Sequence, residues 1–109
     1  MVKKLTREQA IEYTKAYIKR LKDEGLPVTK AYLYGSYARN EARDWSDIDI
    51  AILSPKFLDR FEAHKYLWGK LHKQETLQGL EPIGIHPDNF VDESPLAYWI
   101  KREGIVVDV

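Results

Sequence analysis

The stretch that decides the fold reads Lys30-Ala31-Tyr32-Leu33-Tyr34-Gly35-Ser36, then ten residues, then Asp47-Ile48-Asp49-Ile50-Ala51-Ile52-Leu53. Its two ends are rich in apolar and aromatic residues and predict strands over residues 30–34 and 48–53. Successive side chains of a strand point to opposite faces of the sheet. We therefore expect the two aspartates to share one face and the isoleucines between and after them to share the other.

The Gly35-Ser36 pair directly follows the first predicted strand, and residues 35–40 are predicted to form a short helix. A helix that begins there presents backbone N–H groups and the positive end of its dipole to an anion. The Ser36 hydroxyl adds a further hydrogen-bond donor. We therefore expect this turn to bind phosphate.

Asp47 and Asp49 lie two residues apart, which is about 6.5–7 Å along a strand. Two carboxylates on one face repel each other, and a bound cation relieves that repulsion. Mg²⁺ takes one or two protein carboxylates together with phosphate oxygens and water. Transfer of a nucleotidyl group uses two such ions, about 3.5–4 Å apart, at the attacking and the leaving oxygens. An isolated Asp-x-Asp is a weak signal, but a strand, Gly-Ser, ten residues and Asp-x-Asp together are far more specific.

A third oxygen ligand is expected from a neighbouring strand. Glu81 is the first choice, because it lies near the start of a third predicted strand, where it is also placed to act as a base toward the attacking hydroxyl. Asp88 is the alternative, although it lies beyond that strand in a His-Pro-Asp turn. The alternative to a catalytic role is that Glu81 is a solvated acid at the edge of the strand.

The rest of the chain predicts helices that alternate with a small sheet, an α/β (α+β) pattern with a small mixed β-sheet flanked by helices. A capping box, Thr6 to Gln9, begins the first helix, and Gly25 ends it. The other predicted elements are a helix over 58–78, strands over 80–86 and 105–109, and a helix over 96–102. Pro82 lacks an N–H, so we expect the strand over 80–86 to have an unpaired side.

The chain has 13 aromatic residues, seven of them tyrosine. We expect Tyr17, Phe61 and Trp68 to lie in the core. Tyr98 and Trp99, on the last helix, fit the core and a protein interface equally well.

The composition bounds the class of protein. The 109 residues predict one domain, 1–109, with its own core. Lys+Arg and Asp+Glu both number 17, so the basic excess of a nonspecific nucleic-acid binder is absent and such a partner is not expected. There is no cysteine, hence no disulfide and no thiolate metal site. No long apolar run suggests a signal core or membrane segment, so we expect a cytoplasmic protein.

The residues from Leu33 to Arg39 and from Ser46 to Ile50 resemble the motif of the DNA polymerase β-like nucleotidyltransferase superfamily, in particular its minimal nucleotidyltransferase (MNT) branch. The segments over 80–83 and 100–105 also resemble that family, so the likeness spans nearly the whole chain. The resemblance implies the polymerase β-like fold over 1–109.

For the site, the resemblance implies that Gly35, Ser36 and Arg39 bind the triphosphate of ATP or another nucleoside triphosphate. It further implies Asp47 and Asp49 as metal ligands, with Glu81 as the third catalytic acid.

The chain departs from the family at two positions. Many relatives have Arg where this chain has Tyr37 and Gly where it has Asn40, although Arg39 and Arg43 remain near the motif. Asn tolerates the left-handed conformation, so Asn40 is expected to cap the short helix.

We expect a Mg²⁺-dependent nucleotidyltransferase that moves AMP from ATP onto a hydroxyl. With no second domain to hold an acceptor, the acceptor is expected on another macromolecule. The resemblance suggests a helical HEPN-type protein, with this chain as the antitoxin of a HEPN/MNT toxin–antitoxin module. Two alternatives stay open: an MNT-fold protein that neutralises its partner by contact alone, and a homodimeric nucleotidyltransferase acting on a small molecule.

Overall fold

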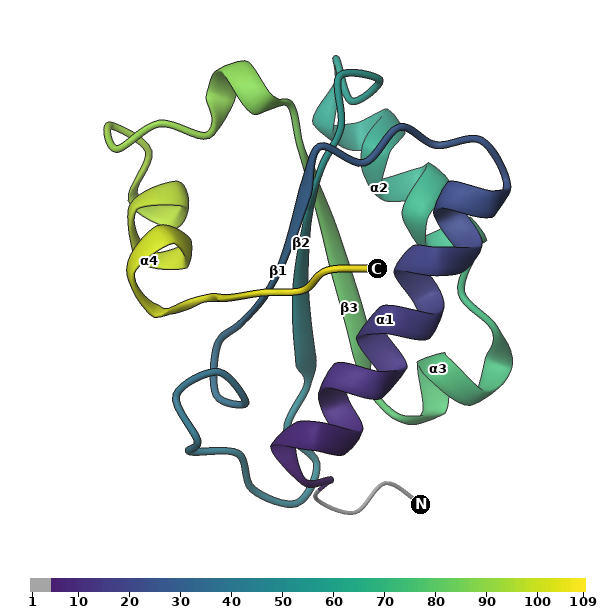
Figure 1. Ribbon diagram of the computed structural model, residues 1–109, viewed down its shortest axis with the longest axis vertical. Coiled ribbons are helices and arrows are strands. Elements are labelled where there is room, and N and C mark those ends of the chain that lie inside the picture. Colours follow the sequence, from purple (N-terminus) through teal and green to yellow (C-terminus); the bar gives the residue numbers. More distant parts are fainter. Residues whose placement is uncertain (1–4) are drawn as a thin grey trace.

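The computed structural model describes residues 5–109 and shows a mixed four-stranded sheet with helices on both faces (Figure 1). The strands are ordered β3-β2-β1-β4 across the sheet. β1 is antiparallel to β2 and to β4, whereas β2 and β3 are parallel. The strand bounds are β1 Lys30–Tyr34, β2 Ile48–Leu53, β3 Leu80–Ile85 and β4 Ile105–Val106. The predicted α/β class with a small mixed sheet is therefore confirmed.

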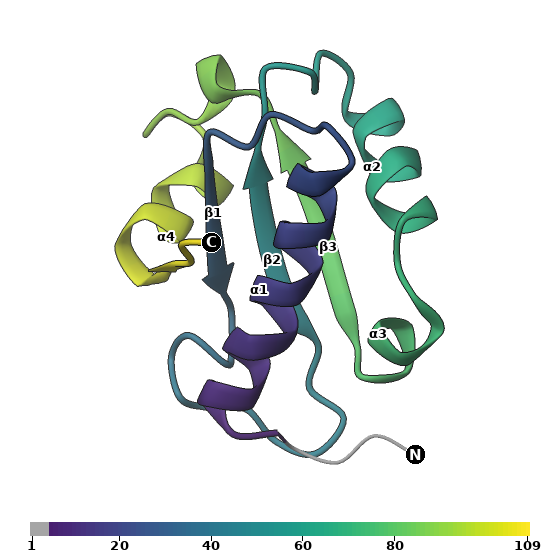
Figure 2. The same ribbon diagram turned by 45° about the vertical axis from the view of Figure 1, so that its right-hand side comes forward.

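The helices divide unequally between the two faces. Figure 2 shows α1 crossing in front of the sheet with α2 and α3 beside it, and α4 lies on the opposite face. The bounds are α1 Arg7–Asp23, α2 Arg60–Gly69, α3 Lys73–Leu77, a 3₁₀ turn Pro87–Asn89 and α4 Pro95–Glu103. Within residues 5–109, no helix has the length and apolar character needed to span a membrane.

The two faces of the sheet bury cores of different size. Ile48, Ile50 and Ile52 are fully buried on the face toward α1 and α2, as their alternation predicts. On the opposite face α4 covers a smaller cluster. The residues of that cluster are Tyr32, Ala51, Leu53, Ile85 and Ile100, with Tyr34, Ile83, Phe90 and Leu96 packed against them.

The sequence predicts both ends of α1 correctly. The Thr6 hydroxyl accepts a hydrogen bond from the Gln9 amide, and the Gln9 side chain accepts one from the Thr6 amide, which completes the capping box. At the other end Gly25 has φ +102°, a conformation that glycine adopts without steric cost.

One edge strand of the sheet is β3, in which Pro82 lies opposite Ile50 of β2. The prediction of an unpaired side is thus confirmed. The carbonyl of Pro82 accepts a hydrogen bond of 3.0 Å from the indole N–H of Trp68, a residue of α2. Pro82 has no N–H to donate, and its carbonyl is already bonded to the indole of Trp68. Both features protect this edge from pairing with another strand.

The predicted helix over 58–78 is wrong in one respect, because it breaks into α2 and α3. The guanidinium of Arg20, on α1, donates to the carbonyl of Lys70 and to both carboxylate oxygens of Glu75. Glu75 in turn accepts a hydrogen bond from the His72 amide. The contact with α1 thus satisfies the Lys70 carbonyl at the break, a cause that no local sequence signal carries.

The break also changes which aromatic residues are buried. Tyr17 is fully buried, as expected, and its hydroxyl donates to the Leu67 carbonyl. Phe61 is 68% exposed and Trp68 37% exposed, so the expectation that both lie in the core is wrong. α2 turns Ala63 and Leu67 toward the sheet, and their spacing of four residues leaves Phe61 on the outer side.

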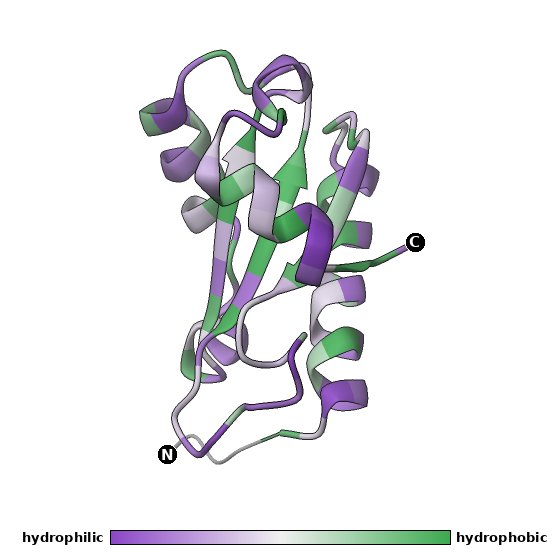
Figure 3. Ribbon diagram, turned by 90° about the vertical axis from the view of Figure 1, so that its left-hand side faces the viewer, coloured by the Kyte–Doolittle hydropathy of each residue, from purple (hydrophilic) through white to green (hydrophobic). Residues whose placement is uncertain are grey.

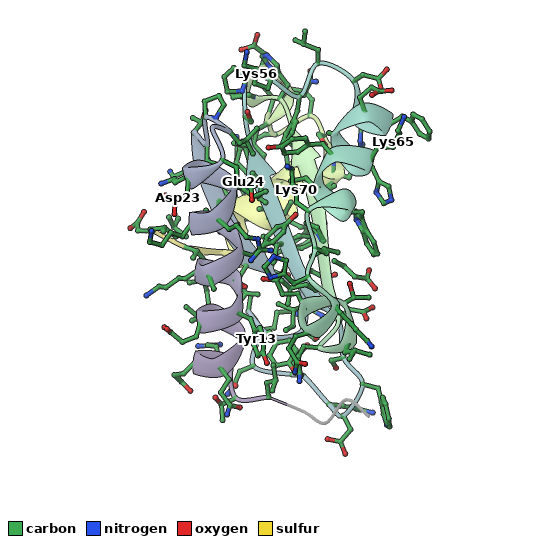
Figure 4. All side chains as sticks on the ribbon, turned by 90° about the vertical axis from the view of Figure 1, so that its right-hand side faces the viewer. Tyr13, Asp23, Glu24, Lys56, Lys65 and Lys70 are labelled. Carbon is green, nitrogen blue, oxygen red and sulfur yellow. The ribbon has the colours of Figure 1, made fainter. Side chains whose placement is uncertain are left out.

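A second link between α1 and α2 lies at the surface. Figure 4 shows Glu24 and Lys70 in the space between the two helices, where their charged groups are 2.9 Å apart. An exposed pair of this kind is screened by solvent and contributes little to stability. The Arg20–Glu75 pair is different, because the Glu75 side chain is only 7% exposed.

We therefore expect Arg20→Met to lower the free energy of unfolding by about 3–5 kcal/mol, because it leaves the Glu75 carboxylate buried without its cation. Urea denaturation followed by circular dichroism measures this. Lys19→Met, which removes the exposed Lys19–Asp23 pair, is the control and is expected to cost less than about 1 kcal/mol. Equal losses for both variants would contradict the role given to the buried pair.

Candidate functional site

A cavity of about 590 Å³ lies between the start of β2, the turn after β1 and helix α4. It has the size of a small-molecule site. Its lining residues are Tyr34, Gly35, Ser36, Arg39, Ser46, Asp47, Asp49, Leu96, Trp99, Ile100 and Glu103. Five of the six residues proposed from the sequence thus line one cavity, and the sixth, Glu81, lies beside it.

The turn after β1 brings Gly35 against Asp49. Tyr34 pairs with Asp49 across the β1–β2 ladder, so the next residue of the chain passes directly over the aspartate. Gly35 has φ +76°, and a Cβ placed on it would collide with the Asp49 carboxylate. Only glycine satisfies both requirements. The turn that the sequence predicts to bind phosphate and the Asp49 carboxylate are therefore in contact.

The short helix predicted over 35–40 is wrong: these residues form successive turns. The Arg39 amide donates to the Gly35 carbonyl, but the Arg7 guanidinium binds the carbonyls of Tyr37 and Ala38. Asn40 then adopts φ +60°, the left-handed conformation anticipated for it, although it ends a turn and not a helix. The expected helix dipole is therefore absent, and the turn offers backbone groups and the Ser36 hydroxyl.

Tyr37 does not line the cavity. Its ring is buried, and its hydroxyl accepts a hydrogen bond from the Leu5 amide. The residue that departs from the family motif is therefore part of the core beneath the turn.

The segment that joins β1 to β2 is largely hydrophilic (Figure 3). Arg39 lies at its start and lines the cavity, with its guanidinium bound to Glu41 at 2.8 Å and to Glu103 of α4 at 3.3 Å. Both pairs are exposed, so solvent screens them and they contribute little to stability. The guanidinium can therefore exchange these partners for a phosphate group at small cost.

The acids lie at the start of the parallel strands β2 and β3. Asp47 is exposed just before β2, and Asp49 pairs with Glu81 in the β2–β3 ladder. Glu81 hydrogen-bonds to Asp47, although it does not itself line the cavity. Asp88 lies past the opposite end of β3, in the 3₁₀ turn, where its amide donates to His86. The geometry groups Glu81, and not Asp88, with the two aspartates.

Burial and repulsion by neighbouring carboxylates raise the pKa values of Asp49 and Glu81. Burial, and then the charge of Asp47, raise the pKa of Asp49 to about 6. Burial, the hydrogen bond to Asp47 and the two aspartate charges raise the pKa of Glu81 to about 7. Burial and the charges of Asp49 and Glu81 raise the pKa of Tyr34 to about 12. The site has an excess of negative charge that a cation would neutralise.

The donors suit Mg²⁺ in kind, because all are oxygen atoms of carboxylates and a hydroxyl. Across residues 5–109, however, no three acidic, histidine or cysteine side chains already converge as a metal site. Mg²⁺ usually retains water and takes substrate phosphate as ligands. The residues present fit a metal that enters with its nucleotide.

Sequence reasoning missed the wall that α4 contributes. Leu96, Trp99, Ile100 and Glu103 follow the spacing i, i+3, i+4, i+7, which places them on one face of the helix. That spacing is visible in the sequence. What the sequence does not show is that this face looks onto the aspartates.

Comparison with known proteins gives a consistent result. A family profile described as a nucleotidyltransferase domain matches residues 14–103. A search of curated protein sequences found no match. Among solved structures, a candidate nucleotidyltransferase from Sulfolobus solfataricus has 15% identity and a TM-score of 0.66, covering 93% of this chain and 81% of its own.

Two further structures are toxin–antitoxin complexes. One, solved with AMP-PNP, has 25% identity and a TM-score of 0.62, covering 86% of this chain and 72% of its own. The other is the MntA–HpeT toxin–antitoxin with two Asp-to-Glu substitutions two positions apart. It has 21% identity and a TM-score of 0.62, covering 88% of this chain and 72% of its own.

Gly35→Ala is expected to destabilise the protein by more than the about 1–2 kcal/mol that a positive φ alone costs, because the new methyl group also displaces Asp49. Gly25→Ala is the matched control, since Gly25 also has positive φ but has no atom within 4 Å of an added Cβ. Thermal unfolding of both variants measures the difference. Equal destabilisation of the two variants would show that the contact between Gly35 and Asp49 does not contribute to the loss of stability.

The raised pKa of Asp49 makes a second prediction. A carboxyl group whose pKa rises on folding favours the folded state while protonated, and this contribution is lost as the pH rises through the folded-state pKa. Without divalent metal, we expect Asp49→Asn to match the wild type near pH 4 and to melt at a higher temperature above pH 7. Melting temperatures across this range test it, and a difference that does not depend on pH would contradict it.

Proposed function

The chain belongs to the nucleotidyltransferase domain family, and we propose that it transfers AMP from ATP to a hydroxyl group and releases pyrophosphate. Membership of this family makes the chain a transferase enzyme. The observation that carries the proposal is the contact of the Gly35 turn with Asp49 inside one cavity. That contact supports the proposal because it brings the turn assigned to the triphosphate next to one of the two carboxylates assigned to the metal.

We assign the two halves of the cavity as follows. Gly35, Ser36 and Arg39 bind the triphosphate, the first two through the turn and the third through its guanidinium. The Ser36 hydroxyl suits this role because it has no partner within the described residues. Asp47 and Asp49 hold Mg²⁺, expected as two ions, with Glu81 as the third acid. The metal supplies positive charge at the attacking and leaving oxygens.

Glu81 is assigned the proton transfer. A group that accepts a proton near neutral pH works best when its own pKa is close to 7, and burial raises the pKa of Glu81 toward that value in the metal-free site. Its carboxyl group lies beside Asp47, which lines the cavity. The proton of the attacking hydroxyl therefore passes to a carboxylate oxygen of Glu81.

We propose a protein as the acceptor, with this chain as the antitoxin of a toxin–antitoxin pair and a HEPN-type protein as its partner. Support comes from the two toxin–antitoxin complexes that share the fold, one of them solved with AMP-PNP. In the other, the two Asp-to-Glu substitutions have the same spacing as Asp47 and Asp49. An open cavity, lined on one side by a single short helix, leaves room for the side chain of a second protein.

Mass spectrometry of a co-expressed HEPN-type partner tests the proposal. We expect the partner to gain the mass of one AMP for each modified hydroxyl. Glu81→Gln should slow the transfer by about 10²–10⁴-fold, because it removes the proton acceptor. Asp88→Asn, at the other end of β3, is the matched control and should leave the rate unchanged.

Two outcomes would contradict this function. Neutralisation of the partner that survives Asp47→Asn and Asp49→Asn would favour inhibition by contact alone. AMP transfer to small hydroxyl compounds by a homodimer, with no modification of the partner, would favour the small-molecule alternative.

A further inference from the structure

We propose that the indole of Trp99 is the surface on which the nucleobase stacks, and that the site consequently binds different nucleoside triphosphates with similar affinity. The inference rests on the proposed function and deepens it, since it says how the cavity binds the nucleobase. AMP transfer is then one case of a reaction that tolerates several bases.

The exposure of Trp99 is the first observation. The residue lies on α4, in the middle of the wall that faces the turn after β1, and its neighbour Ile100 is buried. Trp99 nevertheless remains 56% exposed. A large aromatic surface inside a cavity of nucleotide size is suited to a flat ligand.

The orientation of the indole is set by its neighbours. The ring of Tyr98 meets it edge-on, with centroids 5.3 Å apart and an interplanar angle of 86°. The Arg102 guanidinium lies 3.7 Å from the centroid of the Tyr98 ring. This chain of contacts along α4 restricts the indole before any ligand arrives, so less conformational entropy is lost on binding.

The distribution of charge in the cavity decides which part of the nucleotide meets Trp99. The phosphate-binding atoms of Gly35 and Ser36 lie at the β1 end, beside the aspartates. The α4 wall is apolar except for Glu103, whose carboxylate repels phosphate. With the triphosphate at the turn, the base is therefore the part that lies against α4.

The same wall has little means of distinguishing one base from another. Strong discrimination requires buried groups that hydrogen-bond the base edge, as amide side chains do. Glu103 is the polar side chain that α4 contributes to the described lining, and its carboxylate is partly exposed and not a buried group of that kind. Stacking on an aromatic ring is available to every base. We therefore expect base selectivity to be weak.

Calorimetric titration in Mg²⁺ with ATP, GTP, CTP, UTP and tripolyphosphate tests the proposal. The wild type should bind the four nucleotides with affinities within about tenfold of one another. Trp99→Ala should weaken all four by about 5- to 150-fold and leave tripolyphosphate affinity unchanged. Trp99→Phe should retain most of the affinity. Phe61→Ala removes an exposed aromatic residue on α2, away from the cavity, and should change nothing.

Several results would overturn the inference. Unchanged nucleotide affinity in Trp99→Ala would exclude stacking of the base, even if transfer slows because the indole serves the acceptor. An equal loss of tripolyphosphate affinity would show that the substitution disturbs the cavity as a whole. A wild type that binds neither tripolyphosphate nor nucleotides would refute the proposed function itself, which separates that failure from an error about Trp99.

Discussion

The contact between the Gly35 backbone and the Asp49 carboxylate is the constraint on which the site depends. It is fixed from both sides, by the pairing of Tyr34 with Asp49 and by a positive φ that glycine supplies. Any side chain at this position would push the carboxylate away from the turn. The cavity, the negative charge within it and the direction of the polar segment that follows all depend on this single close approach.

The helices cover the two faces of the sheet unequally, and this leaves the contact between Gly35 and Asp49 accessible. α1, α2 and α3 bury one face, and the Arg20–Glu75 pair ties them together. The opposite face has only α4, which leaves the ends of β1 and β2 facing a cavity. Burial and the neighbouring acidic charges raise the pKa of Asp49 and of Glu81, so the free site is electrostatically unfavourable, and a cation with its nucleotide would relieve this.

Local patterns in the sequence were sufficient to predict the strands, both ends of α1 and the placement of the two aspartates beside each other. They failed where a distant residue decides the backbone. Arg7 binds the carbonyls of the 35–40 turn, and Arg20 binds the carbonyl at the break between α2 and α3. The α4 wall shows the same limit: spacing defines its face, but only the fold shows that Trp99 lines the same cavity as the aspartates.

The most direct test of this account is a titration with Mn²⁺ followed by electron paramagnetic resonance, with and without a nonhydrolysable nucleoside triphosphate. Because no three side chains of residues 5–109 form a metal site in advance, the metal should bind about 5- to 150-fold more tightly when the nucleotide is present. Asp49→Asn should abolish that gain. Mn²⁺ affinity that is the same with and without nucleotide, or a gain that survives Asp49→Asn, would contradict the account.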